Sequence, residues 1–295
     1  MNRITRIYLL FLVLCSCKLS GQQDPHFTLY KYNMNIVNPA YVGSTGYTEL
    51  NTGFRSQWVG VIGGPETQSF SLSTPISNDV GLGLSVVHDN VFVLDETHLY
   101  ADFSYKLKLS ESSNLFLGLK AGGSFLNIDL VKIGINDDPL FNQNVSRFNP
   151  NIGIGAYLLG EKYFVTISAP GLLSNDRYER EGFFPVSASD RLHIFTGAGY
   201  TFTLTENIDF NPSFMIKTVA GSPISYDLTG LFSFYKKFEI GASYRNEESI
   251  SAATFFRAAK WLKIGYSYEY TITDIATYNS GTHEVLLRFN LDNKY

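Results

Sequence analysis

The sequence predicts an all-β protein, a transmembrane up-and-down antiparallel β-barrel of about 14 strands that follows an irregular N-terminal segment. Three observations lead to this prediction. Apolar residues recur at every second position, the segments with this period are long, and short and long connections alternate between them. A soluble sandwich also alternates, but its strands average only about 5–6 residues. A propeller would show a repeat of about 40 residues with a recurring signature, which this sequence lacks.

Residues 1–21 are predicted to be a secretion signal. Arg3 and Arg6 supply a basic start, and the apolar run that follows is too short to span a bilayer as a helix. Two processing routes are open. Cleavage after Gly21 would remove both cysteines of the chain, and the mature protein would then have no thiol chemistry. Alternatively, the residues around Cys17 resemble a lipobox, and Cys17 would become a lipidated N-terminus.

Composition narrows the class of protein further. The formal net charge is −4 and the predicted signal carries only basic charges, so the mature chain is more acidic still, which argues against nucleic acid as a partner. The chain has 19 Tyr and 23 Phe but only 17% charged residues. No later stretch approaches the roughly 18 apolar residues of a transmembrane helix. An aromatic, weakly charged chain without such a helix fits a membrane barrel.

Each element of the barrel is predicted from its two-residue period. In the stretch 261–271, Ile264 and Tyr266 fall on one face and Ser267 and Glu269 on the other, so the first pair is expected to face lipid and the second the lumen. The predicted strands cover residues 47–57, 66–74, 79–88, 97–109, 114–130, 149–159, 162–169, 190–204, 207–218, 224–234, 238–245, 250–258, 261–271 and 282–292. Most reach the ~9–11 residues that a tilted strand needs to cross a bilayer.

The connections between these strands alternate in length. Tight ones are predicted at 75–78, 110–113, 160–161, 205–206 and 235–237. Longer ones are predicted at 58–65, 89–96, 131–148, 170–189 and 272–281. This alternation is typical of tight periplasmic turns and long external loops. The connections near 219–223 and 246–249 are shorter than the pattern demands on the external side.

Motifs that carry chemistry are weak or absent. Gly81-Leu82-Gly83 and Gly153-Ile154-Gly155 do not continue as phosphate-binding loops, so we expect them to relieve crowding on one barrel face. His283-Glu284 lacks the second His of a zinc helix and is expected at the lumen or rim. Asn136, Asp137 and Asp138 could hold calcium, but a solvated loop explains them as well. No catalytic, cofactor-binding or metal site is predicted, and the protein is not expected to be an enzyme.

The segment 22–46 precedes the first strand and is too aromatic for a free linker, because Phe27, Tyr30, Tyr32 and Tyr41 need a surface to pack on. One interpretation is a strap across the periplasmic mouth. The other is a lumen plug or a docking surface for periplasmic machinery. The chain is thus divided into a signal peptide (1–21), a strap or plug segment (22–46) and the barrel (47–295).

Two ordered motifs in this region resemble those of the PorP/SprF family of type IX secretion system outer-membrane proteins. The motif positions are Asp24, Pro25, Phe27, Tyr30, Asn33, Asn38, Pro39, Ala40, Gly43, Arg55, Gln57, Trp58, Gly60, Pro65 and Thr67, with His283 and Glu284 in the last strand. The resemblance covers nearly the whole mature chain. It implies an integral outer-membrane barrel of a secretion and gliding-motility apparatus, with its N-terminus periplasmic after signal cleavage.

The resemblance also implies a function in protein secretion. Family members help a co-secreted surface protein, such as an adhesin with a type IX C-terminal domain, to reach or stay on the cell surface, together with other type IX secretion components and outer-membrane lipid. The loops 131–148 and 170–189 are the candidate contact regions. The mixture of Arg and aromatic residues at Arg177, Tyr178, Arg180, Phe183 and Phe184 is typical of interface cores. The alternative is a porin-like or fatty-acid-type channel for small molecules.

Overall fold

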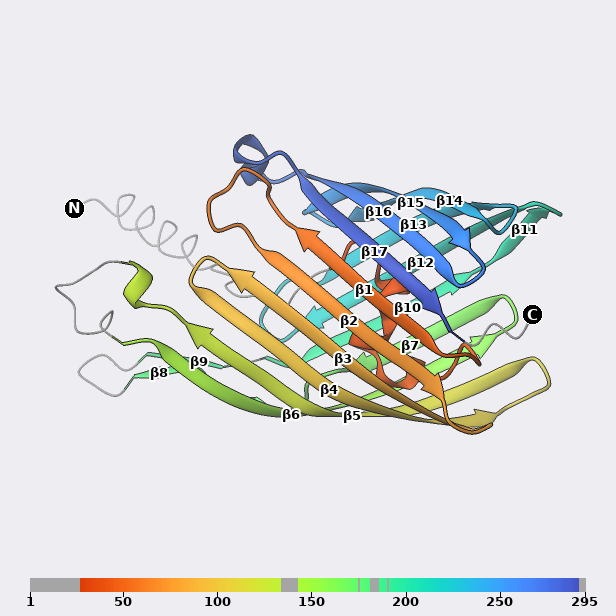
Figure 1. The fold of residues 1–295 in the computed structure, drawn as a ribbon, viewed down its shortest axis with the longest axis horizontal. Helices are drawn as coiled ribbons and strands as arrows, with labels where there is room; N and C mark the ends of the chain where they lie inside the picture. The colour runs from red at the N-terminus through yellow and green to blue at the C-terminus, as the bar shows by residue number, and fades with distance from the viewer. Residues whose placement is uncertain (1–26, 134–142, 175, 181–185, 190, 292–295) are drawn as a thin grey trace, which may run out of the picture.

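The chain folds as one closed antiparallel barrel with tilted strands (Figure 1). The computed structural model describes residues 27–133, 143–174, 176–180, 186–189 and 191–291. The barrel closes where β1 pairs with β17, in a register that runs from Glu49↔Asn290 to Ser56↔His283. Its wall has fourteen strands, since β10 and β11 are two parts of one strand interrupted at Thr201 and both pair with β12. The predicted 14-stranded barrel is confirmed.

The wall strands match the predicted segments closely in place. They are β1 (Glu49–Ser56), β2 (Glu66–Pro75), β3 (Val80–Val91), β4 (Leu94–Lys108), β5 (Ser113–Ile128), β6 (Val145–Gly160), β7 (Tyr163–Ala169), β10 (His193–Tyr200), β11 (Phe202–Thr205), β12 (Ile208–Val219), β13 (Ser225–Phe234), β14 (Phe238–Arg245), β15 (Ser249–Ala259), β16 (Leu262–Thr271) and β17 (Thr282–Asn290). Each pairs with its neighbours along the chain, as an up-and-down meander requires.

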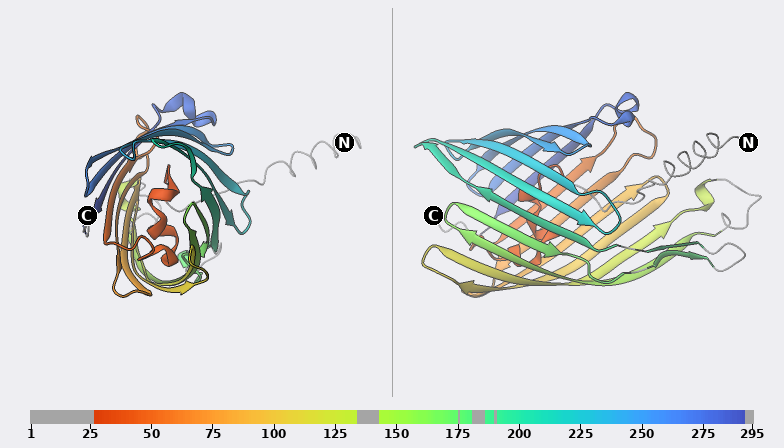
Figure 2. Two further views of the ribbon diagram at one scale, coloured as in Figure 1. Left: turned by 90° about the vertical axis from the view of Figure 1, so that its right-hand side faces the viewer. Right: turned by 180° about the vertical axis from the view of Figure 1, so that it is seen from behind.

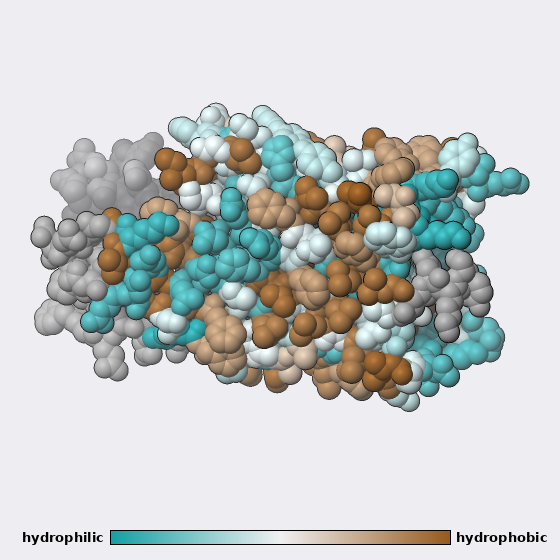
Figure 3. All heavy atoms as spheres, viewed as in Figure 1, coloured by the Kyte–Doolittle hydropathy of each residue, from teal (hydrophilic) through white to brown (hydrophobic). Residues whose placement is uncertain are grey.

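The two faces of the wall follow the two-residue period. On β4, Leu99 and Phe103 are exposed on the outside, whereas Asp102 and Ser104 between and beside them are buried in the lumen. The outward apolar side chains form a broad band over the strands, with hydrophilic residues gathered toward both ends of the barrel (Figure 3). This band is the surface that a barrel presents to lipid. No helix in the described ranges is long and apolar enough to cross a membrane.

The barrel has a turn end and a loop end. The turn end carries the short connections, such as 76–79 and 235–237, and the loop end carries most of the long ones, including those with η3 (Val131–Ile133) and η5 (Asp274–Tyr278). The prediction of a long loop at residues 89–96 is wrong. The ladder of β3 and β4 continues to Val91↔Leu94, so only two residues connect these strands.

A second, smaller sheet stands apart from the wall at the loop end. It consists of β8 (Asp176–Arg180) and β9 (Val186–Ser189), which pair with each other and not with the barrel strands. The long connection between β7 and β10 is therefore partly an ordered hairpin. It projects beyond the barrel rim beside the start of β6 (Figure 1).

The N-terminal segment lies inside the barrel, where the end-on view shows it as a red ribbon surrounded by the wall (Figure 2). It contains η1 (Tyr30–Tyr32), α2 (Met34–Val37) and η2 (Pro39–Tyr41). We call residues 27–46 the plug. Most plug side chains between Phe27 and Val42 are buried, and they form the core of the molecule together with inward residues of the wall such as Phe116 and Tyr157.

Candidate functional site

The plug runs along the lumen from the loop end to the turn end. At its start, the carbonyl oxygen of Phe27 accepts a hydrogen bond from Arg245, the last residue of β14 before a loop-end turn. At its end, the Gly43 backbone N–H donates to Ser73 Oγ (2.9 Å), close to the 76–79 turn. A strap across one mouth would touch only one rim. The described plug instead contacts the wall over most of its height.

Local sequence explains why the plug is compact. Asn38 lies before η2, its side chain accepts a hydrogen bond from the Ala40 N–H (2.8 Å), and Pro39 occupies the first helical position, where no N–H is needed. The Asn38 amide also donates to Thr166 Oγ1 (2.7 Å) and to the Ala156 carbonyl (3.0 Å) on the wall. Asn38 therefore both shapes the turn and attaches it to β6 and β7.

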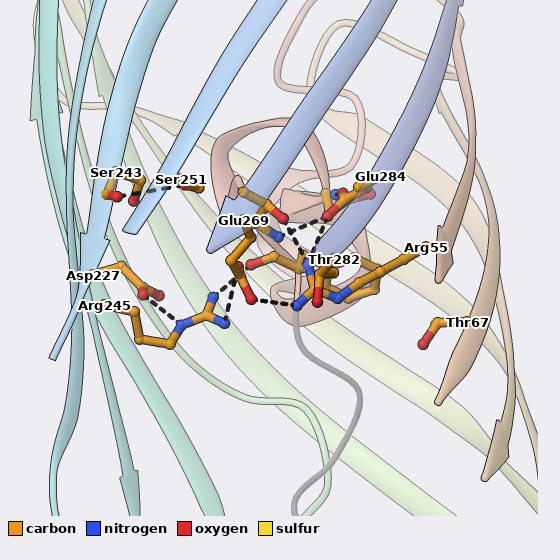
Figure 4. A network of polar contacts seen from close by, with 12 residues as sticks. Arg55, Thr67, Asp227, Ser243, Arg245, Ser251, Glu269, Thr282 and Glu284 are labelled. Carbon is orange, nitrogen blue, oxygen red and sulfur yellow. Dashed lines mark hydrogen bonds and ion pairs between the residues drawn. The ribbon is translucent and has the colours of Figure 1, made fainter. Parts of the chain in front are cut away.

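An arginine and two glutamates attach the start of the plug (Figure 4). Arg55 of β1 pairs with Glu269 of β16 (2.9 Å) and with Glu284 of β17 (3.3 Å). Its guanidinium also donates to Thr28 Oγ1 (2.6 Å), while Glu284 accepts from the Thr28 N–H (2.8 Å). Charges this deeply buried are tolerated only when they are paired and hydrogen-bonded. Thr28 therefore contributes two hydrogen bonds to this cluster.

A second arginine extends the cluster around the barrel. Arg245 Nε donates to Asp227 Oδ1 (2.7 Å), and its Nη1 lies 3.8 Å from the second oxygen of Glu269 (Figure 4). Glu269 therefore bridges Arg55 and Arg245. The same guanidinium holds the Phe27 carbonyl (2.7 Å). The result is one polar network that joins β1, β17, β16, β14 and β13 and holds the first two described residues of the plug.

A third group of ion pairs holds the plug around Tyr32. Arg288 of β17 pairs with Glu49 (3.3 Å) and donates to the Tyr32 carbonyl (3.0 Å). The Tyr32 hydroxyl donates to Glu239, which also pairs with Lys263 (2.7 Å). Burial raises the pKa of the Tyr32 phenol, and the neighbouring Glu239 carboxylate raises it further. Tyr32 therefore remains a protonated donor at neutral pH.

Several of these contacts are made to plug carbonyls rather than to plug side chains. In addition to Arg245 and Arg288, Ser168 donates to the Val37 carbonyl (2.7 Å) and Ser104 to the Val42 carbonyl. Polar residues on the lumen face thus satisfy backbone groups that the irregular plug cannot satisfy by itself. The polar lumen, which in an open barrel would be hydrated, is here the receptor surface for the plug.

Glycines on the wall allow the plug to approach closely. A Cβ on Gly118 would lie 2.1 Å from the Ala40 nitrogen, and one on Gly155 would lie 2.0 Å from Asn38 Oδ1. Gly81 similarly faces the Val42 carbonyl, at 2.4 Å from an ideal Cβ. The expectation that the two Gly-x-Gly stretches relieve crowding on one barrel face agrees with this geometry. At Gly81, Gly83 and Gly155 the crowding comes from the plug, whereas at Gly153 it comes from Pro170.

The motif positions are brought together in part. Phe27, Tyr30, Asn33, Asn38, Pro39, Ala40 and Gly43 lie in the plug, Arg55 and Glu284 in the first ion cluster, Thr67 on the lumen face of β2, and Gln57, Trp58, Gly60 and Pro65 in or beside the β1–β2 loop. His283 points outward and contacts the Tyr266 hydroxyl (2.7 Å). Asp24 and Pro25 lie outside the described residues.

The loop residues predicted for partner binding are described only in part. Arg177, Tyr178 and Arg180 belong to β8, for which the backbone alone is described. Phe183 and Phe184 lie outside the described residues, as do Asn136, Asp137 and Asp138. Among the residues that the structure describes, no cluster of three or more His, Cys, Asp or Glu could hold a metal ion.

The sequence motifs identified only Arg55 and Glu284 of the ion network, and the two-residue period placed Glu269 in the lumen without a partner. Glu49, Asp227, Arg245 and Arg288 were not predicted as site residues, although each lies at an inward position of a strand with apolar outward residues. A charged residue at such a position is a usable signal, because it must face the lumen. The two-residue period does not show which lumen residues contact each other, so it could not predict the ion pairs.

The fold and the lumen define the class of protein: an integral outer-membrane β-barrel with an internal plug. The chain belongs to the family described as type IX secretion system membrane protein PorP/SprF, whose model matches residues 19–289. The resemblance seen in the motifs is thereby confirmed. No curated protein sequence is significantly similar to the chain.

The chain is similar in fold to solved β-barrel structures. The CymD monoaromatic hydrocarbon channel has a TM-score of 0.51 at 13% identity, over 91% of this chain and 95% of that chain. A FadL homologue from Pseudomonas aeruginosa has a TM-score of 0.51 at 11% identity, over 92% of this chain and 95% of that chain. At these identities the likeness concerns the fold alone. It supports the barrel architecture, while the outer-membrane localisation rests on the family to which the chain belongs.

Proposed function

We propose that this protein is a plugged barrel of a type IX secretion and gliding system that binds a co-secreted surface protein and helps to export or anchor it. Its partners would be a surface protein with a type IX C-terminal domain and other components of the system. The role is one of binding rather than catalysis. The observation that carries the proposal is the plug, which fills the lumen that a channel would keep open.

The energetics of the plug support a closed barrel. Arg55 and Arg245 are buried, and each donates a hydrogen bond to the plug, to the Thr28 hydroxyl and the Phe27 carbonyl. Withdrawing the plug would remove these hydrogen bonds from two buried charges, and a hydrogen bond to a charged group contributes about 1.5–3 kcal/mol. A solute passing through would have to displace the plug from several such contacts at once.

The loop end offers a surface for a partner. The β8–β9 hairpin is paired independently of the wall, so its strands are presented beyond the rim while the barrel below stays fully paired. Arg177, Tyr178 and Arg180 lie on β8, and Phe183 and Phe184 follow it in the sequence. Arg and aromatic residues are enriched at the energetic centres of interfaces. We propose these five residues as the first contact candidates.

Deletion of residues 174–185 tests the proposal. Because β8 pairs only with β9, the barrel should fold, and rejoining a long connection adds little entropic cost. The expected result is loss of one co-secreted surface protein from the cell surface with unchanged uptake of small solutes. Deletion of residues 274–278 from another loop-end connection is the matched control and should retain the surface protein.

The alternative function, a channel for small molecules, predicts the opposite result. Surface proteins would stay in place and solute flux would change in the 174–185 deletion strain. Surface retention and solute flux are measured in the same strain. A misfolded barrel would alter both quantities, and it is recognised by the loss of heat-modifiable migration on gels. Normal surface retention with altered flux would overturn the proposal and favour the channel.

A further inference from the structure

A cavity of about 110 Å³ lies in the half of the lumen near the loop end, above the plug. Its apolar side is formed by Phe27 and Val37 of the plug and by Phe195 of β10. Its polar side includes Lys120 of β5, Arg191 just before β10, and His193 at the start of β10. None of the described residues that line it is acidic. The cavity is thus amphipathic, with basic groups on one side.

Two basic side chains line this cavity, Lys120 and Arg191. Lys120 is almost completely buried, and its ammonium is held by Asp102 Oδ1 (2.8 Å) and Ser85 Oγ (3.0 Å). An ammonium has three N–H donors, so these two hydrogen bonds leave one donor, on an ammonium that also lies 5.1 Å from the centre of the Tyr100 ring. Arg191 uses one nitrogen on the Ala220 carbonyl (2.8 Å), and a guanidinium carries five donors. Asp102 neutralises Lys120, so Arg191 gives the cavity a net positive charge.

Volume limits the size of the ligand. Drug-sized pockets measure about 300–1,000 Å³, whereas an engineered cavity of about 150 Å³ holds a single benzene ring. At about 110 Å³ this cavity is smaller still, so the apolar group of a ligand can be no larger than a single ring and its head must be small. Among anionic heads, a planar carboxylate matches an arginine fork best.

We propose that this cavity is a binding site for a carboxylate on a compact apolar group. The carboxylate would contact Arg191 and Lys120, and the apolar part would pack on Phe27 and Val37. This inference rests on the cavity and is independent of the proposed role in secretion. Two sources could supply the carboxylate. One is a free organic acid, and the other is the side chain of Asp24, which precedes Phe27 by three positions in the sequence.

Titration of benzoate against the purified full chain in detergent tests the proposal, with benzamide as the uncharged probe of the same shape. The wild-type protein and Asp24→Asn are titrated in parallel by calorimetry. If a free acid is the ligand, benzoate binds both proteins at least tenfold more tightly than benzamide. If Asp24 is the occupant, benzoate binds Asp24→Asn at least tenfold more tightly than it binds the wild type. Equal affinity for benzoate and benzamide in both proteins would overturn the site.

Two further variants show whether binding occurs in this cavity. Arg191→Gln removes the positive charge from an exposed side chain, so the barrel should still fold, and benzoate should bind at least tenfold more weakly. Lys108→Gln removes an exposed charge at the turn end and should leave benzoate affinity unchanged. Each variant is first checked for heat-modifiable migration. Benzoate binding that Arg191→Gln leaves intact in a folded protein would place the ligand elsewhere and reject the proposal.

Discussion

Arg55 of β1 forms a 2.9 Å ion pair with Glu269 of β16, although β17 lies between these strands, and the two side chains are only 2% and 5% exposed. The pair crosses the closure of the barrel, where the first and last wall strands meet. Glu284 of β17 lies beside it and also contacts Arg55. Because the same guanidinium holds Thr28, one side chain contributes both to barrel closure and to plug attachment.

Arg55→Met should destabilise the barrel by about 3–5 kcal/mol, because it leaves two buried carboxylates without their shared partner. The free energy of unfolding is measured by urea titration of the protein in lipid vesicles. Adding Glu269→Gln and Glu284→Gln should recover part of the loss, since these changes remove the uncompensated charges. Lys108→Met, at an exposed site, should change stability by less than about 0.5 kcal/mol. Equal effects of Arg55→Met and Lys108→Met would contradict the assigned role of the cluster.

Tyr32→Phe should destabilise the barrel less than Arg55→Met does. The substitution removes the hydroxyl that donates to Glu239, but that carboxylate keeps its ion pair with Lys263 (2.7 Å). The ring still stacks on Phe255, at 4.0 Å between centroids. Loss of one hydrogen bond to a charged group corresponds to about 1.5–3 kcal/mol. The same urea titration measures it, and a loss as large as that of Arg55→Met would show that Glu239 depends on Tyr32 more than on Lys263.

Arg55 and Tyr32 also show what the sequence could and could not predict. The two-residue period located every wall strand, because inward and outward positions differ in burial along most of the wall. The aromatic content of the N-terminal segment indicated that it must pack on something. Its path could not be predicted, since Tyr32 meets Glu239 and Phe255, more than two hundred positions away. The motif identified Arg55 and Glu284, but no local pattern connects them with Glu269.

The faces of β16 give a third prediction. Tyr266 is 42% exposed and points outward, whereas Ser267 is buried in the lumen, as the period predicted. Tyr266→Arg should destabilise the barrel by about 2–4 kcal/mol if the site lies at the bilayer midplane, and less nearer an interface. In an open lumen Ser267→Arg would be harmless. In this plugged lumen it should also destabilise, because Ser267 lies beside Leu29 and Glu284 around a cavity of only about 10 Å³.

Urea titration in vesicles compares the two arginine variants of β16. Tyr266→Phe and Ser267→Ala are the matched controls, since they keep size and polarity close to the original residues. If Ser267→Arg has the same unfolding midpoint as Ser267→Ala, the plug moves at little energetic cost to make room for the arginine side chain. Tolerance of Tyr266→Arg would mean that this face does not contact lipid.

Gly118→Val should open the barrel without touching any charge. Gly118 of β5 faces the plug, and a Cβ there would lie 2.1 Å from the Ala40 nitrogen and 2.5 Å from its Cα, so the plug or the wall must move. The wall strand is fixed by hydrogen bonds on both sides, to β4 and β6, whereas η2 of the plug is attached by fewer contacts. We therefore expect the plug to be displaced.

Conductance in planar bilayers measures that displacement. The wild-type protein should give a closed, low-conductance barrel, and Gly118→Val should give discrete current steps. Gly230→Ala is the matched control. The atom nearest to the added Cβ belongs to the Phe210 ring, 3.3 Å away, and this ring can move slightly. It should remain closed. A wild-type conductance equal to that of Gly118→Val would mean that the plug does not seal the lumen, and the case for a binding protein over a channel would lose its main support. If Gly118→Val folds and stays closed, the wall strand has moved and the plug has stayed in place.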